Sequence, residues 1–109
     1  MADNSYDFEY ASALVETKDF AKAWEYVLPH ANAGDSNAQC MMGFLCEFGP
    51  LQDLKAAERW LRKAAEQRNA AEWNNLGTLL LRKGETQNAK ECFRRAVELG
   101  FTMAAPLAE

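Results

Sequence analysis

Few residues in this sequence could carry chemistry, and His30 comes first because it is the only histidine. Histidine acts as a general base or a metal ligand when a nucleophile, an acid or a second ligand stands at a defined spacing. No serine, cysteine or acidic partner accompanies His30 at such a spacing. We therefore interpret His30 as an exposed or half-packed residue rather than a catalytic one.

The three cysteines, Cys40, Cys46 and Cys92, also lack the spacing of a metal site. Metal binding favours a Cys-x-x-Cys pair or a histidine-rich set, and neither is present. Cys40 and Cys46 fall on different sides of one predicted helix. We interpret all three as free thiols that pack as small apolar side chains, and we expect no metal and no other cofactor.

The longer motifs of catalysis are missing as well. The sequence contains no phosphate-binding glycine-rich loop, no nucleophile elbow and no paired catalytic carboxylates in a recognisable frame. We therefore expect that the protein is not an enzyme.

Residues 73–93 show the pattern of large and small residues that organises the chain. Trp73, Leu76 and Leu80 share one helical face. Gly77 and Ala89 remove bulk where two antiparallel helices approach each other. The break between the helices is Lys83-Gly84-Glu85, and the second helix continues from Ala89 to Phe93. The residues expected to be buried are Trp73, Leu76, Leu80, Phe93, Ala57 and Leu61.

This order of residues resembles the tetratricopeptide repeat, W-x₂-L-G-x₂-Y followed by A-x₃-F, with Leu80 in the place of the usual tyrosine. The resemblance implies an all-α, right-handed superhelical solenoid of about three antiparallel helix hairpins. It also implies that the first helix of each hairpin lines a concave groove.

The same spacing recurs along the chain. Moving back 34 residues brings Gly77 onto Gly43, whereas the second helix needs a shift of 32, which brings Phe93 onto Leu61. The difference predicts two extra residues in the loop over residues 48–53. We expect a single domain over 1–109, with repeats at about 5–35, 36–69 and 70–101 and a short capping segment at 102–109.

Parts of the first two repeats resemble the Sel-one-like branch of the same superfamily. The residues that carry this resemblance are Lys18-Asp19-Phe20, Asp35-Ser36-Asn37-Ala38-Gln39 and the run over residues 57–67. The Gly-x-Gly loop of that branch is absent, so we interpret the chain as a hybrid of the two repeat types.

The local pattern predicts helices over residues 6–16, from about 20 onward, and over 37–47, 54–67, 71–83 and 86–99. Ser5 or Asn4 is the expected N-cap of the first helix. Pro29 is expected to kink or end the second helix near Leu28, because an interior proline costs roughly 3 kcal/mol.

Hydropathy and net charge indicate where in the cell the protein is expected and which classes of partner it is expected to bind. No apolar run approaches the roughly 20 residues of a membrane helix, and the N-terminus has neither a basic start nor an apolar stretch. We expect a cytoplasmic protein that does not bind membranes. The formal net charge is −4 and the pI is about 5.0, which disfavours nucleic acid as a partner.

The resemblance assigns nine residues to the concave groove. They are Phe8, Ser12 and Glu16 in repeat one, Cys40, Phe44 and Glu47 in repeat two, and Asn74, Thr78 and Arg82 in repeat three. In repeat two the position aligned with Arg82 is Phe48, and Glu47 is adjacent to it. Phe44 is either an anchor for a partner or a residue that packs against the first helix of repeat three. Arg82 is expected to bind a carboxylate of the partner, while Glu16 and Glu47 favour basic residues.

These features favour a protein-interaction module or scaffold that binds a peptide or a partner helix in the groove. The alternative is an assembly or regulatory subunit, similar to a secretion chaperone or an immunity protein. Such a subunit acts through self-association or through contacts of the convex face. In both cases the expected partner is another protein or peptide.

Overall fold

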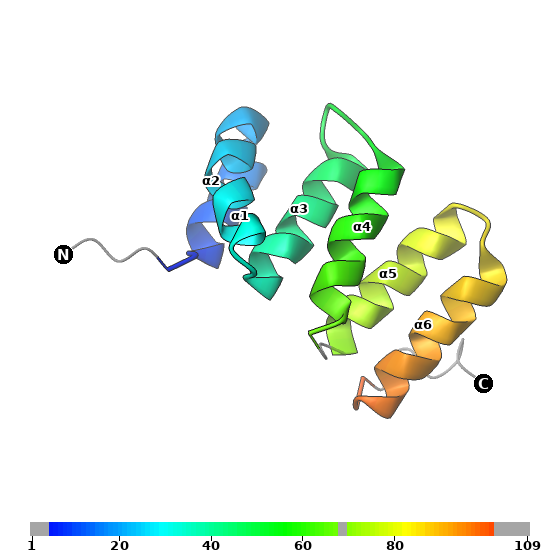
Figure 1. Ribbon diagram of the computed structural model, residues 1–109. Coiled ribbons are helices and arrows are strands. Elements are labelled where there is room, and N and C mark those ends of the chain that lie inside the picture. The colour runs from blue at the N-terminus through cyan, green and yellow to red at the C-terminus, as the bar shows by residue number, and fades with distance from the viewer. Residues whose placement is uncertain (1–4, 68–69, 102–109) are drawn as a thin grey trace.

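The computed structural model describes residues 5–67 and 70–101, which form six helices and no strand. The helices are α1 (Phe8–Glu16), α2 (Phe20–Asn32), α3 (Ser36–Phe48), α4 (Leu54–Ala65), α5 (Ala70–Arg82) and α6 (Thr86–Glu98). Each helix packs on the next one along the chain, and α1 also contacts α3 (Figure 1). The molecule is elongated, at 47 × 30 × 21 Å. The predicted all-α superhelical solenoid is confirmed.

The predicted core is also confirmed. Trp73, Leu76, Leu80, Phe93, Ala57 and Leu61 are all buried, and they belong to one cluster that runs through the described helices. Burying a large apolar side chain contributes about 1.5–3 kcal/mol. The core therefore joins the helices into one structure, which fixes how the first helices present their exposed faces.

Two glycines allow the helices of a hairpin to approach closely. A Cβ atom on Gly77 would lie 2.7 Å from Cε1 of Phe93, and one on Gly43 would lie 2.6 Å from Cδ2 of Leu61. Both distances are too short for a real contact, so the glycine and the large residue opposite it form a matched pair. The predicted equivalence of Gly43 and Gly77 thus has a structural basis.

Aspartates begin the first four helices. The carboxylates of Asp7, Asp19, Asp35 and Asp53 each accept a hydrogen bond from the backbone N–H three residues further on. The prediction that Ser5 or Asn4 caps the first helix was wrong, since the helix begins at Phe8 and Asp7 is the cap. Asp7 also brings a negative charge to the positive end of the helix dipole, which favours it over serine.

Of the two alternatives predicted for Pro29, an end of the second helix near Leu28 was wrong, because α2 continues to Asn32. The kink stays a prediction. Proline removes the hydrogen bond to the carbonyl of Glu25. Pro29 and Glu25 are both exposed, so water can satisfy that carbonyl. Continuing the helix also keeps Ala31 buried in the core.

Two further expectations concern the chain ends and membranes. The predicted capping segment at 102–109 lies outside the described residues. None of the six helices that the structure describes is long and apolar enough to span a membrane.

Candidate protein-binding groove

Helices α3 and α5 enclose a groove with a volume of about 230 Å³. Its walls follow helical periodicity, since Cys40, Phe44 and Phe48 are four residues apart on α3, as Thr78 and Arg82 are on α5. The complete lining is Cys40, Phe44, Glu47, Phe48, Leu61, Asn75, Thr78 and Arg82. We call this concavity the α3–α5 groove.

The structure brings five of the nine predicted site residues together in the α3–α5 groove: Cys40, Phe44, Glu47, Thr78 and Arg82. Asn74 is half-buried next to it, and its backbone carbonyl accepts a hydrogen bond from the Thr78 hydroxyl at 3.1 Å. Asn75, one residue further, lines the groove instead. Phe8, Ser12 and Glu16 stand on α1 and do not line this groove.

The charged residues of the groove pair with each other. The guanidinium of Arg82 donates to the carboxylate of Glu47, which is buried. It also lies 4.7 Å from the centre of the Phe48 ring, within the range of a cation–π contact. Burial raises the pKa of the Glu47 carboxyl above its ordinary value, while Arg82 opposes that rise. The sequence had assigned both charges to a partner and gave no sign of this pair.

Two aromatic rings form the exposed apolar part of the groove. Phe44 and Phe48 are 41% and 52% exposed, and their ring centres lie 5.0 Å apart. Phe44 also borders Asn75 and Thr78 across the groove. It therefore keeps a free surface although it faces α5. Sequence reasoning aligned Phe48 with the other groove positions but did not choose it.

The other end of the groove is polar. The side-chain amide of Asn75 donates to the Cys40 sulfur at 3.7 Å and to Oε2 of the buried Glu72 at 3.4 Å. Burial, and then the neighbouring Glu72 carboxylate, raise the pKa of the Cys40 thiol well above its ordinary value. A thiol held in its protonated form is a poor nucleophile, so this end is suited to hydrogen bonding.

An aromatic cluster that sequence reasoning missed closes the first hairpin. The rings of Tyr6 and Tyr10 lie 5.9 and 4.8 Å from that of Tyr26, and His30 lies 5.1 Å from the same ring. The Tyr26 hydroxyl accepts a hydrogen bond from the Asp7 N–H at 2.8 Å. The half-packed state predicted for His30 is confirmed, and its spacing of four residues from Tyr26 was the available signal.

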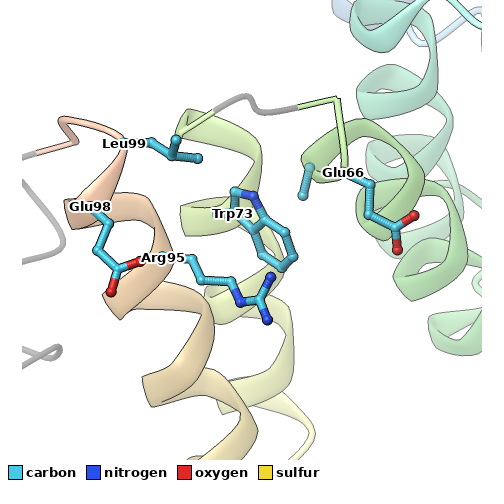
Figure 2. A pocket seen from close by; sticks show the side chains of 6 residues that line it. Glu66, Trp73, Arg95, Glu98 and Leu99 are labelled. Carbon is cyan, nitrogen blue, oxygen red and sulfur yellow. The ribbon is translucent and has the colours of Figure 1, made fainter.

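A second concavity, of about 270 Å³, lies on the other side of the third hairpin, where the ends of α4 and α6 meet the start of α5 (Figure 2). The guanidinium of Arg95 lies 4.9 Å from the Trp73 ring. Glu66 and Glu98 add carboxylates to the lining. Its charges are mixed, and Trp73 itself is buried.

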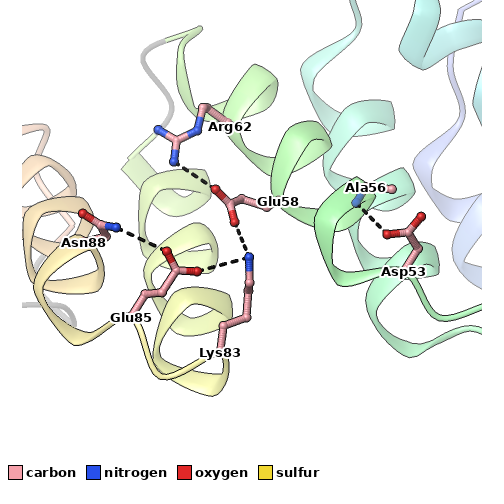
Figure 3. A network of polar contacts seen from close by, with 7 residues as sticks. All are labelled: Asp53, Ala56, Glu58, Arg62, Lys83, Glu85 and Asn88. Carbon is pink, nitrogen blue, oxygen red and sulfur yellow. Dashed lines mark hydrogen bonds and ion pairs between the residues drawn. The ribbon is translucent and has the colours of Figure 1, made fainter.

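Ion pairs tie α4 to the turn between α5 and α6 (Figure 3). The Lys83 ammonium lies 2.6 Å from Oε1 of Glu58 and 3.1 Å from Oε2 of Glu85. Arg62 adds a contact to Glu58 at 3.4 Å. The hydrogen bond from Lys83 lowers the pKa of the Glu58 carboxyl. We call these four residues the Lys83 clasp, and it holds repeat three against repeat two.

Within residues 5–67 and 70–101, no group of three or more His, Cys, Asp or Glu side chains is placed to hold a metal ion. The three cysteines are free.

In a comparison with known protein families, residues 70–100 match the tetratricopeptide repeat. The match coincides with the third hairpin, where the sequence pattern was most complete, and it confirms that assignment. The Sel-one-like character of the other repeats stays a prediction. No curated protein matches the chain.

Proposed function

We propose that the chain is a protein-interaction module that binds a peptide or a partner helix in the α3–α5 groove. Tetratricopeptide repeats are generally protein–protein interaction modules, and the matched repeat supplies one wall of the groove. The observation that carries the proposal is the pair of exposed rings, Phe44 and Phe48, next to hydrogen-bonding groups on α5. Exposed aromatics beside polar groups are typical anchors of an interface.

In this proposal an apolar side chain of the partner packs on Phe44 and Phe48. The Asn75 amide and the Thr78 hydroxyl then offer hydrogen bonds to the partner's backbone. Arg82 remains 45% exposed although it binds Glu47, so its outer N–H groups can take a partner carboxylate. Glu47 thus acts by holding Arg82 in place.

The groove is proposed to continue along α1. Phe8 is 56% exposed, and Glu16 is exposed at the end of the same helix. With Ser12 between them, these residues would meet the basic end of the bound peptide. The partner segment is therefore expected to be acidic towards α5 and basic towards α1.

A pull-down with the intact chain tests the proposal, with Thr78→Arg as the blocking variant. Thr78 is exposed, so an arginine side chain there can fill the groove without entering the core. The partner is expected to be lost from this variant and retained by Ala71→Arg, an exposed change on the same helix. Equal capture by both variants would show that the groove is not the binding site.

The second candidate function is an assembly or regulatory subunit that associates with itself. Leu81, Val97 and Leu99 are each 37% exposed on the last hairpin, which offers apolar surface for such contacts. Sedimentation velocity distinguishes the two functions. A concentration-dependent dimer that Val97→Glu dissolves would favour this second candidate.

A further inference from the structure

The loop between α3 and α4 is a sequence feature that the α3–α5 groove does not use. It covers residues 49–53, whereas residues 17–19 join α1 to α2 and residues 83–85 join α5 to α6. The predicted insertion of two residues is therefore confirmed. In Figure 1 this loop rises above the helices that it connects.

The insertion builds one wall of an apolar pocket of about 330 Å³. The opposite wall comes from α2, and the whole lining consists of apolar residues and glycine: Phe20, Ala21, Trp24, Leu45, Gly49, Pro50 and Leu51. We call it the loop pocket. Its volume is at the low end of ligand sites, which span roughly 300–1,000 Å³, so it suits one bulky side chain.

Hydrogen bonds hold this loop in place. The backbone N–H of Asp53 donates to the Cys46 carbonyl at 2.7 Å, and the Gln52 side chain donates to the Glu47 carbonyl at 2.9 Å. Leu51 nevertheless remains 77% exposed. Because Leu51 also lines the loop pocket, the fixed loop presents an exposed apolar side chain at the edge of an apolar concavity.

Two lysines, Lys55 and Lys83, line a second depression beside the loop. Pro50 and Leu51 also border this shallow depression, and Asp53 lines it as well. Lys83 belongs to the Lys83 clasp, and the Asp53 carboxylate caps α4. Lys55 is exposed and forms no ion pair with any residue that the structure describes. The Lys55 ammonium is therefore free to meet an acidic group of a ligand.

We propose that the loop pocket is a second docking site, which takes a bulky apolar side chain of a partner protein whose following residues are acidic. The apolar side chain enters between Trp24 and Leu51. The acidic residues then cross Leu51 towards Lys55. This site is separate from the α3–α5 groove and shares no lining residue with it.

The test is an NMR titration of the intact ¹⁵N-labelled chain with three synthetic peptides: acetyl-Trp-Glu-Glu-amide, acetyl-Ala-Glu-Glu-amide and acetyl-Trp-Lys-Lys-amide. The first peptide is expected to shift the amide signals of Ala21, Gly49 and Leu51 saturably. The alanine peptide should bind at least tenfold more weakly, because it lacks the anchor. The lysine peptide should bind about threefold more weakly, and added salt should reduce that difference.

Two variants locate the site. Ala21→Arg fills the pocket from an exposed position and should weaken binding at least tenfold, whereas Ala71→Arg should leave it unchanged. Lys55→Glu should reverse the preference for the acidic peptide. Equal binding of all three peptides, or unchanged binding by Ala21→Arg, would overturn the proposal. Thr78→Arg blocks only the α3–α5 groove and should not affect this titration. The proposal for the loop pocket and the proposal for the groove can therefore be disproved independently.

Discussion

Gly77 allows the two helices of the third hairpin to pack closely, since the Phe93 ring occupies the space of its missing side chain. Gly77→Leu is expected to lower the free energy of unfolding by about 1–3 kcal/mol or more, because overpacking a buried site forces neighbours apart. Urea unfolding measures the change. Ala71→Leu, an exposed change on the same helix, is the control.

Repeat one suggests a way to rescue the smaller change at this position. It has Ala11 and Val27, both buried, where repeat three has Gly77 and Phe93. Gly77→Ala should destabilise the parent, and it should cost less in a Phe93→Val background, where valine leaves room for the added methyl group. If Gly77→Leu is as stable as the parent, or if Gly77→Ala costs the same in both backgrounds, the matched pair is misinterpreted.

Lys18 has a left-handed backbone, with φ at +61°, at the turn where repeat three has Gly84 at +82°. A non-glycine residue there costs about 1–2 kcal/mol. Lys18→Gly is therefore expected to raise the free energy of unfolding by up to about 1 kcal/mol, after the greater flexibility of the unfolded chain is subtracted. Thermal unfolding measures it.

Lys22→Gly provides the contrast, because Lys22 is exposed inside α2. There glycine should lower stability by about 1 kcal/mol. If both glycine variants destabilise the protein equally, Lys18 carries no strain.

At the scale of the helices, sequence reasoning succeeded where periodicity decides the structure and failed where tertiary packing does. The helix boundaries of repeats two and three were predicted to within one or two residues, because Asp53, Gly84 and the apolar spacing all agree. The predicted helix end at Pro29 was wrong, since the cost of an interior proline depends on which side of the helix it faces. That side is exposed, and only packing reveals it.

The Lys83 clasp makes the contact between α4 and the α5–α6 turn sensitive to acid. Lys83 holds the pKa of Glu58 below its ordinary value of 4.5. The ionised carboxylate therefore stabilises the fold above that value, and this stabilisation is lost as the pH falls through the lower pKa of the folded state. Glu58→Gln should lower the melting temperature at pH 7 and reduce its fall between about pH 4.5 and pH 3.

Glu47 should behave in the opposite way. Burial raises the pKa of its carboxyl above 4.5, so its contribution to stability is present below that value and is lost as the pH rises through the higher pKa of the folded state.

Glu91→Gln is the control for Glu58→Gln, because Glu91 forms only exposed pairs within α6. If Glu58→Gln and Glu91→Gln give the same pH profile of melting temperature, the clasp does not stabilise the fold.

At the scale of the whole molecule, the repeat period predicted which helices face the groove but not how their side chains pair. Phe44, Thr78 and Arg82 line one concavity, because equivalent positions on successive first helices lie side by side in a solenoid. Their role in binding a partner stays a prediction. The bond between Glu47 and Arg82 joins residues 35 apart in the chain. It depends on the distance between α3 and α5, which no local pattern contains.

Variants of two arginines on different faces of the solenoid test which face binds the partner. Arg82 stands in the α3–α5 groove, whereas Arg94 is exposed on α6 and pairs with Glu91. Once a partner is identified, Arg82→Glu is expected to weaken binding more than tenfold, about 1.4 kcal/mol, and Arg94→Glu should change it little. Isothermal titration calorimetry measures both.

Because Arg82→Glu leaves the buried Glu47 beside a second carboxylate, it also destabilises the fold. The double variant Glu47→Gln, Arg82→Gln removes both charges together and should keep the melting temperature close to that of the parent. If binding requires the Arg82 cation, this neutral variant should still lose affinity for an acidic partner. If Arg94→Glu lowers the affinity for the partner and the neutral double variant binds it normally, the partner binds the convex face.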